Sequence, residues 1–290
     1  MAPTVPAIET VRYRTTRVRD VIDRDEQPIA WREAGPADGD VVVFLHGLGA
    51  TRTSWDLQLA ELADRWRCVA WDMPGYGGSP SPGGPLTFEL IADAVVGLLD
   101  TLGSATAHLV GLSFGGMHAL HTALRHPDRV RSLSLVDSSP AFGLDGETTR
   151  EGWIAARLEA IDGGASVRDI SPLVLAAISG PGFGGADLDH AIASMNRISE
   201  DGLRAAVHLL PDHDVLDRLS TIDVPTLVVV GELDEETPPA YAAALATGIP
   251  GTRRHEVIPG VGHLTPLEAP ATFNPILRSF LETVHTMETL

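Results

Sequence analysis

The 290-residue chain has 44% hydrophobic and 21% charged residues, a composition typical of a globular protein rather than a disordered one. Its formal net charge is −18 and all 21 basic residues are arginine, which argues against nucleic acid or an anionic membrane as a partner, because phosphate binding needs clustered positive charge. Cys68 is the only cysteine, and the sequence shows neither a signal-peptide pattern nor an apolar run of about 18 residues, so we expect a cytoplasmic protein without a membrane span.

Short runs rich in β-branched residues alternate with helical patterns, which is typical of a mostly parallel sheet covered by helices. Val41–Leu45 is continuously apolar, as in a strand that is buried on both faces. Similar runs predict strands at residues 68–71, 107–110, 130–136, 226–230 and 253–258. The residues before Val41 alternate more loosely, and we expect them to form an antiparallel pair at one edge. The prediction is an α/β fold with a mostly parallel sheet of eight strands.

Helical patterns lie between these strands. Residues 88–102 carry apolar side chains at helical spacing, with Thr87 placed as the N-cap and Gly103 just past the end. Residues 114–126 predict a second helix. Residues 270–284 predict a closing helix that starts with proline in its first turn.

The strand pattern is absent between about residue 139 and residue 214. Residues 153–161 and 203–210 have helical patterns, and the glycine-rich residues 180–185 break the segment between them. We therefore predict a core domain of residues 1–138 and 215–290, with a helical cap of residues 139–214 inserted into it.

The sharpest motif is at residues 111–116, which read Gly-Leu-Ser-Phe-Gly-Gly between a predicted strand and a predicted helix. A G-x-S-x-G pattern in that position is typical of a nucleophile elbow, a tight turn that needs small residues on both sides of the serine. The turn exposes the hydroxyl of Ser113 beside a helix N-terminus, where backbone N–H groups can stabilise an anion. The sequence thus predicts Ser113 as a nucleophile.

A serine nucleophile needs a base, and in this order of elements the base follows the last strand. His263 lies there, in a glycine-rich loop. The acid that orients the histidine is expected after the strand at residues 226–230, where Asp234 is our choice among four carboxylates. Asp137, at the end of the preceding strand, is the alternative acid.

An oxyanion hole requires two backbone donors. Phe114 N–H follows the nucleophile, and Leu48 N–H lies in the loop after Val41–Leu45, so we assign these two. His118 and His121 have the spacing of a metal-binding pair, but no third ligand is evident, and we expect neither a metal nor a cofactor.

With these elements in place, the chain resembles the α/β-hydrolase superfamily from about Ile29 to Val284. The matching segments are residues 46–49 (His-Gly-Leu-Gly), 72–79, 111–116, 231–234 and 262–263. The resemblance implies a serine hydrolase acting on a small-molecule substrate, with Asp234 as the usual acid and Glu268 bracing the histidine loop. Whether the chain forms homo-oligomers stays open.

Within the superfamily the chain most resembles 3-oxoadipate enol-lactonases and related small esterases, on residues 111–117, 224–239 and 263–268. This resemblance implies cleavage of a carboxylic ester or an enol-lactone through an acyl-enzyme. Residues 72–75 read more like carbon–carbon bond hydrolases of aromatic ring-cleavage pathways, although those usually have tryptophan where this chain has Leu264. Serine at position 113 makes dehalogenase and epoxide hydrolase chemistry unfavourable, since those families use a carboxylate nucleophile.

The substrate is expected between the elbow and the cap, where Trp153, Phe183 and Met195 are candidate contacts. Three cap arginines could hold a substrate carboxylate, although solvated positions are favoured for each: Arg150, Arg157 and Arg197. A second hypothesis is a small-molecule receptor on the same fold, which turnover would distinguish from an enzyme.

Overall fold

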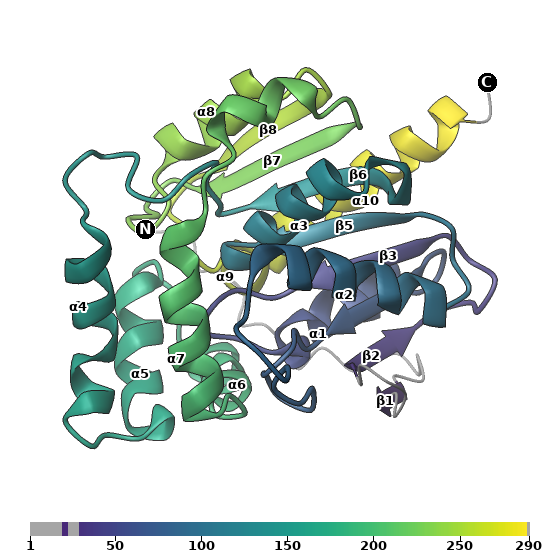
Figure 1. The fold of residues 1–290 in the computed structure, drawn as a ribbon. Coiled ribbons are helices and arrows are strands. Elements are labelled where there is room, and N and C mark those ends of the chain that lie inside the picture. The colour runs from purple at the N-terminus through teal and green to yellow at the C-terminus, as the bar shows by residue number, and fades with distance from the viewer. Residues whose placement is uncertain (1–18, 23–28, 289–290) are drawn as a thin grey trace, which may run out of the picture.

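The computed structural model describes residues 19–22 and 29–288. Its centre is one eight-stranded sheet with the order β1-β2-β4-β3-β5-β6-β7-β8 (Figure 1). The strands are β1 (Arg19–Ile22), β2 (Ala30–Ala34), β3 (Val41–Leu45), β4 (Arg67–Trp71), β5 (Ala107–Leu112), β6 (Val130–Val136), β7 (Thr226–Gly231) and β8 (Thr252–Ile258). β2 runs antiparallel to β1 and β4, and the remaining neighbours are parallel. The predicted sheet, including its antiparallel edge pair, is confirmed.

Burial along the strands follows from their place in the sheet. Every residue of β3, β5 and β7 is buried, as expected for central strands covered on both faces. β8 instead alternates between more and less exposed residues, because it lies at the sheet edge. The continuous apolar runs that predicted the central strands therefore reflect helices on both faces.

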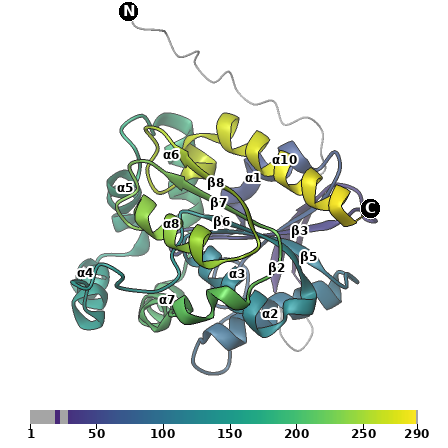
Figure 2. The same cartoon turned by 90° about the horizontal axis from the view of Figure 1, so that it is seen from above.

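Helices cover both faces of the sheet. α2 (Phe88–Thr101) and α3 (Phe114–Arg125) pack side by side on one face, and α1 (Asp56–Leu62) and α10 (Pro270–Glu288) lie together on the other (Figure 2). α8 (Pro239–Gly248) packs against β7 and β8, and α9 (Thr265–Glu268) precedes α10. Thr87 caps α2 as predicted, accepting a hydrogen bond from Leu90 N–H at 3.1 Å. Short 3-10 turns occupy Arg52–Trp55, Pro127–Arg129, Leu210–Asp212 and Leu216–Thr221.

Four further helices lie between β6 and β7 in the chain, beyond the end of the sheet (Figure 1). They are α4 (Arg150–Asp162), α5 (Val167–Ile178), α6 (Gly185–Met195) and α7 (Glu200–Leu209). α4 packs on α7 and α5 packs on α6. We refer to α4–α7 as the cap helices; their treatment as a separate domain stays a prediction. No helix in the described ranges combines the length and apolar character needed to cross a membrane.

Candidate active site

Ser113 lies in the turn between β5 and α3, with a φ of 55° that L residues rarely adopt. The turn is too tight for side chains beside the serine. A Cβ on Gly115 would lie 2.0 Å from Leu45 O, and one on Gly111 would lie 2.3 Å from Gly115 O. Glycine at both positions therefore lets the backbone hold Ser113 in this strained conformation.

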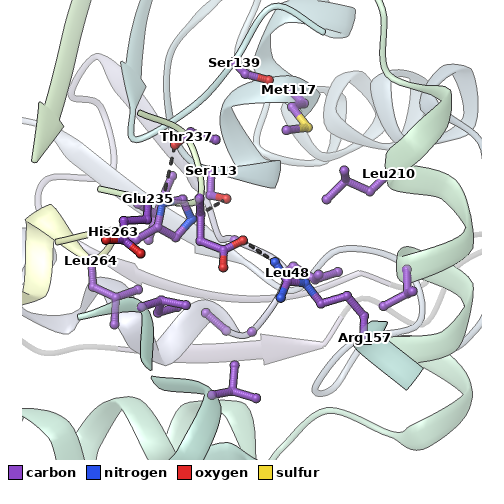
Figure 3. Close-up of a pocket in the computed structure, with 18 of the residues that line it drawn as sticks. Leu48, Ser113, Met117, Ser139, Arg157, Leu210, Glu235, Thr237, His263 and Leu264 are labelled. Carbon is purple, nitrogen blue, oxygen red and sulfur yellow. Dashed lines mark hydrogen bonds and ion pairs between the residues drawn. The ribbon is translucent and has the colours of Figure 1, made fainter. Parts of the chain in front are cut away.

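Ser113, His263 and Asp234 form one continuous hydrogen-bonded chain (Figure 3 labels the first two). His263 Nε2 lies 2.8 Å from Ser113 Oγ, and His263 Nδ1 lies 2.8 Å from Asp234 Oδ2. The three residues come from the turn after β5, the loop after β8 and the loop after β7. The structure thus brings together the three residues chosen from the sequence.

The loop after β7 fixes the carboxylate of Asp234. Glu236 N–H and Thr237 N–H each donate to Asp234 Oδ1 at 2.9 Å, and the Thr237 hydroxyl donates to Oδ2 at 2.9 Å. Thr237 was not predicted as a site residue, although an aspartate with threonine three residues later is a pattern typical of such side-chain-capped turns. Thr237 is therefore a further residue that orients the carboxylate of Asp234.

The environments of His263 and Asp234 favour a charged pair. Burial alone would lower the pKa of His263, but the charge of Asp234 and its hydrogen bond outweigh burial and raise that pKa. Burial would likewise raise the pKa of Asp234, but His263 and the donors of Thr237 outweigh it and lower that pKa. Asp234 therefore stays ionised and favours a proton on Nδ1 of the ring.

Asp137, the alternative acid, is fully buried after β6 with a φ of 45°. It accepts hydrogen bonds from Gly231 N–H at 3.0 Å and from the N–H and hydroxyl of Thr265, each at 2.9 Å. Burial and the charge of Asp234 raise the pKa of Asp137 to about 7. Its carboxyl joins the end of β7 to the start of α9, whereas His263 Nδ1 bonds to Asp234.

The loop after β3, which carries Leu48, is held by contacts with residues 73–76. His46 accepts a hydrogen bond from Met73 N–H at Nε2, 3.1 Å away, and its ring stacks on Tyr76 with centroids 5.3 Å apart. The Tyr76 hydroxyl donates to Leu48 O at 3.0 Å. Leu48 lines the same cavity as Ser113, and Phe114 is the first residue of α3, so its N–H has no acceptor within the helix.

Glu268 connects the histidine loop to the segment between α5 and α6. Its Oε2 accepts from Gly262 N–H at 2.9 Å and from Gly180 N–H at 2.8 Å, and its Oε1 accepts from Leu264 N–H at 2.8 Å. Close by, His263 N–H donates to Ile178 O, in the last residue of α5, at 2.8 Å. The expected bracing role of Glu268 matches this geometry.

A cavity of about 530 Å³ opens beside Ser113 and His263, a volume within the roughly 300–1,000 Å³ of small-molecule sites. Of the three predicted substrate contacts, Trp153 and Met195 line this cavity. Phe183 is not among the lining residues; it is partly buried and packs against the hydrophobic core.

The three cap arginines differ in position. Arg157 lines the cavity and pairs with Glu236 (Figure 3). Arg150 pairs with Asp212 outside the cavity, and Arg197 is not among the lining residues. Only Arg157 is therefore placed to meet a bound molecule.

His118 and His121 lie on α3 and pack with aromatic rings rather than with carboxylates. His121 Nε2 lies 3.1 Å from His213 Nδ1, and the buried His118 ring packs against Phe114 with centroids 4.2 Å apart. Burial lowers the pKa of all three histidines, to about 4 for His121 and about 3 for His213. Within residues 19–22 and 29–288, no group of three or more His, Cys, Asp or Glu is arranged to hold a metal ion.

Several curated proteins are similar to this chain over most of its length. A pimeloyl-[acyl-carrier protein] methyl ester esterase of Neisseria meningitidis is 32% identical over 259 residues, covering 87% of this chain and 98% of the relative. A Variovorax paradoxus protein whose assigned activity, carbamate hydrolysis, is itself provisional is 33% identical, covering 89% and 97%. The 3-oxoadipate enol-lactonase 2 of Acinetobacter baylyi is 23% identical, covering 91% and 97%.

Solved structures of hydrolases are also similar to this chain over most of its length. A hydrolase from Pseudomonas aeruginosa superposes with a TM-score of 0.80 at 28% identity, covering 91% of this chain and 98% of the other. The enol-lactonase of Burkholderia xenovorans superposes with a TM-score of 0.78 at 26% identity, covering 90% and 100%. The family described as the alpha/beta hydrolase family matches residues 42–276, which confirms the resemblance found in the motifs. The chain belongs to the alpha/beta hydrolase family.

Proposed function

We propose that this hydrolase cleaves small carboxylic esters or lactones through an acyl-enzyme, with Ser113 as nucleophile, His263 as base and Asp234 as the orienting acid. The observation that carries the proposal is the unbroken chain from Ser113 Oγ to His263 to Asp234, with 2.8 Å at each step, at the wall of a cavity. The esterase and lactonase activities named for the relatives support the same reaction class.

In the first half of the reaction, His263 Nε2 takes the proton of Ser113 as Oγ attacks the substrate carbonyl. The carbonyl oxygen becomes an oxyanion, which the N–H groups of Leu48 and Phe114 stabilise. The imidazolium then gives its proton to the departing alkoxide, which leaves as an alcohol and leaves the acyl group on Ser113. Asp234 holds the ring and stabilises its charge without taking the proton.

In the second half, His263 removes a proton from water, and the resulting hydroxide attacks the acyl-enzyme. The second tetrahedral intermediate collapses, the carboxylic acid leaves, and the proton returns to Ser113 Oγ. Every proton in the cycle moves through the same imidazole, so the enzyme is regenerated after one water is consumed.

The test is hydrolysis of p-nitrophenyl acetate and butyrate by the wild type and by Ser113→Ala. We expect multiple turnovers by the wild type and a loss of about 10³-fold or more in kcat for the variant, because the residual site keeps only binding and oxyanion stabilisation. Ser279→Ala is the matched control, since Ser279 is exposed on α10. A wild type without turnover, and without labelling of Ser113 by a fluorophosphonate, would refute the proposal and favour a ligand receptor.

A further inference from the structure

The inner wall of the cavity is apolar. Ten buried leucine, isoleucine, valine and methionine side chains form it, each no more than 9% exposed. They come from the elbow region, from α5 to α7 and the turn that follows, and from the histidine loop and α9: Leu112, Met117, Ile170, Leu175, Met195, Leu203, Val207, Leu210, Leu264 and Leu267. A carboxylate placed against this wall would lose its hydration without gaining a donor, which is strongly unfavourable.

The exposed side of the same cavity is acidic. Asp145, Glu235 and Glu236 line it, and all three are exposed. Hydrogen bonds from the hydroxyl and N–H of Thr148 and from another N–H lower the pKa of Asp145, which keeps this carboxylate ionised. We call these three residues the acidic mouth. Because the whole chain has a net charge of −18, the acidic mouth presents a negative potential to an approaching molecule.

Arg157 does not reverse that potential. Among the described residues that line the cavity, it is the only one with a permanent positive charge, and it is already paired with Glu236. Its guanidinium also lies over the Trp153 ring at 5.4 Å, and Trp153 packs edge-on against Phe142 at 5.7 Å. Figure 3 shows Arg157 reaching from the cap ribbon into the cavity, with this pairing drawn as a dashed line.

The Arg157–Glu236 pair also has a link to the proposed acid. Glu236 N–H donates to Asp234 Oδ1, so the glutamate that holds Arg157 belongs to the loop that fixes the acid. A substrate carboxylate at Arg157 would share the guanidinium with Glu236 and would meet the negative charge of that glutamate at close range. The resident pair therefore has both charge and geometry in its favour.

From these contacts we propose that the site selects uncharged esters and lactones with an apolar acyl chain and rejects substrates whose acyl group ends in a carboxylate. This inference rests on the proposed function and names its substrate class. The apolar chain lies along the inner wall, while the acidic mouth and the occupied Arg157 disfavour a second negative charge.

A matched pair of substrates tests the selectivity directly. p-Nitrophenyl hexanoate and mono-p-nitrophenyl adipate have acyl chains of the same length and differ in the terminal carboxylate. We expect kcat/KM for the hexanoate to exceed that for the adipate by about 100-fold, because the carboxylate meets an apolar wall and an acidic mouth. From acetate to hexanoate, kcat/KM should rise about threefold to fourfold per methylene.

Two further measurements separate charge from shape. Glu235→Gln removes one carboxylate of the mouth and should raise kcat/KM for the adipate about threefold relative to the hexanoate. Glu159→Gln is the matched control, because Glu159 is exposed on α4 but does not line the cavity, and it should leave the ratio unchanged. Adding about 0.5 M NaCl should bring kcat/KM for the adipate closer to kcat/KM for the hexanoate, since salt screens exposed charges.

Some outcomes would overturn the inferred selectivity alone, and others the proposed function. Equal or better hydrolysis of the adipate would overturn the inference while leaving the serine hydrolase intact. A preference for the hexanoate that neither salt nor Glu235→Gln reduces would overturn the charge argument, and so would activity that falls steadily from acetate to hexanoate. No hydrolysis of any ester, with Ser113 unlabelled by a fluorophosphonate, would refute the proposed function itself.

Discussion

Glu268 offers the sharpest prediction, because one carboxylate accepts three backbone N–H donors, two from the residues on either side of His263 and one from Gly180 between α5 and α6. A hydrogen bond to a charged acceptor contributes about 1.5–3 kcal/mol. Since Glu268 is only partly buried, water can replace part of that contribution. We expect Glu268→Ala to lower the free energy of unfolding by about 3 kcal/mol.

Glu268→Gln should have a smaller effect. The amide oxygen can replace Oε2 and keep the donors of Gly180 and Gly262, but the amide NH₂ then faces Leu264 N–H and one bond is lost. We expect a loss of about 1 kcal/mol. Because His263 lies between two of the bonded residues, Glu268→Ala should also reduce kcat by about 10- to 100-fold, with a smaller change in KM.

Urea denaturation followed by circular dichroism gives the stabilities, and p-nitrophenyl butyrate gives kcat and KM. Glu282→Gln is the control: Glu282 pairs with Arg65 at 3.4 Å with both side chains more than 40% exposed, so its change should stay within about 0.5 kcal/mol. If Glu268→Ala unfolds like the control, or if glutamine and alanine at position 268 are equally destabilising, the three hydrogen bonds of Glu268 do not stabilise the fold as expected.

Three other outcomes follow from the site. His263 must be neutral to act as a base, and its pKa is raised by Asp234, so kcat/KM should fall as the pH falls, with a midpoint above 6.5; a lower midpoint contradicts the pairing. Asp234→Asn should reduce kcat by about 10⁴-fold. Asp137→Asn should reduce kcat far less. It should also move the fall of kcat/KM at acid pH to lower pH, because it removes a negative charge that raises the pKa of His263. A larger loss of kcat in Asp137→Asn than in Asp234→Asn would make Asp137 the acid. Gly115→Ala places a Cβ 2.0 Å from a carbonyl oxygen of β3 and should lower Tm sharply or prevent folding. The control is Gly97→Ala on α2, which has open space around it and should raise the free energy of unfolding by about 0.5–1 kcal/mol. Equal Tm values for the two variants would show that the elbow tolerates a side chain.

The fold was largely predictable because its strongest signals are local. The central strands are continuous apolar runs, and the turn at Ser113 needs glycines that are visible in the sequence. The loops that carry Asp234 and His263 were also predictable, because each one directly follows a strand with a recognisable local pattern. Patterns of this kind depend on a few adjacent residues, which a sequence displays directly.

The parts that escaped prediction depend on tertiary contacts or lack periodicity. α8 is an alanine-rich segment without an apolar stripe, so no pattern marked it. α5 went unassigned although Ser166 and Asp169 form a capping box at its start, a signal that was available. Phe183 was expected at the substrate but packs against the core, and the pairing of Arg157 with a loop residue 79 positions away has no local signature.

The hydrogen bond from His263 N–H to the last residue of α5 bears on how enzymes of this kind can be re-engineered. Exchanging cap segments between relatives is an attractive route to new specificities, because the segment enters and leaves the core near β6 and β7. Here the residues around Ile178 and Gly180 are anchored to the loop of the proposed base. A graft that replaced them would alter the reaction centre together with the pocket, so a modular exchange has to keep this short segment native.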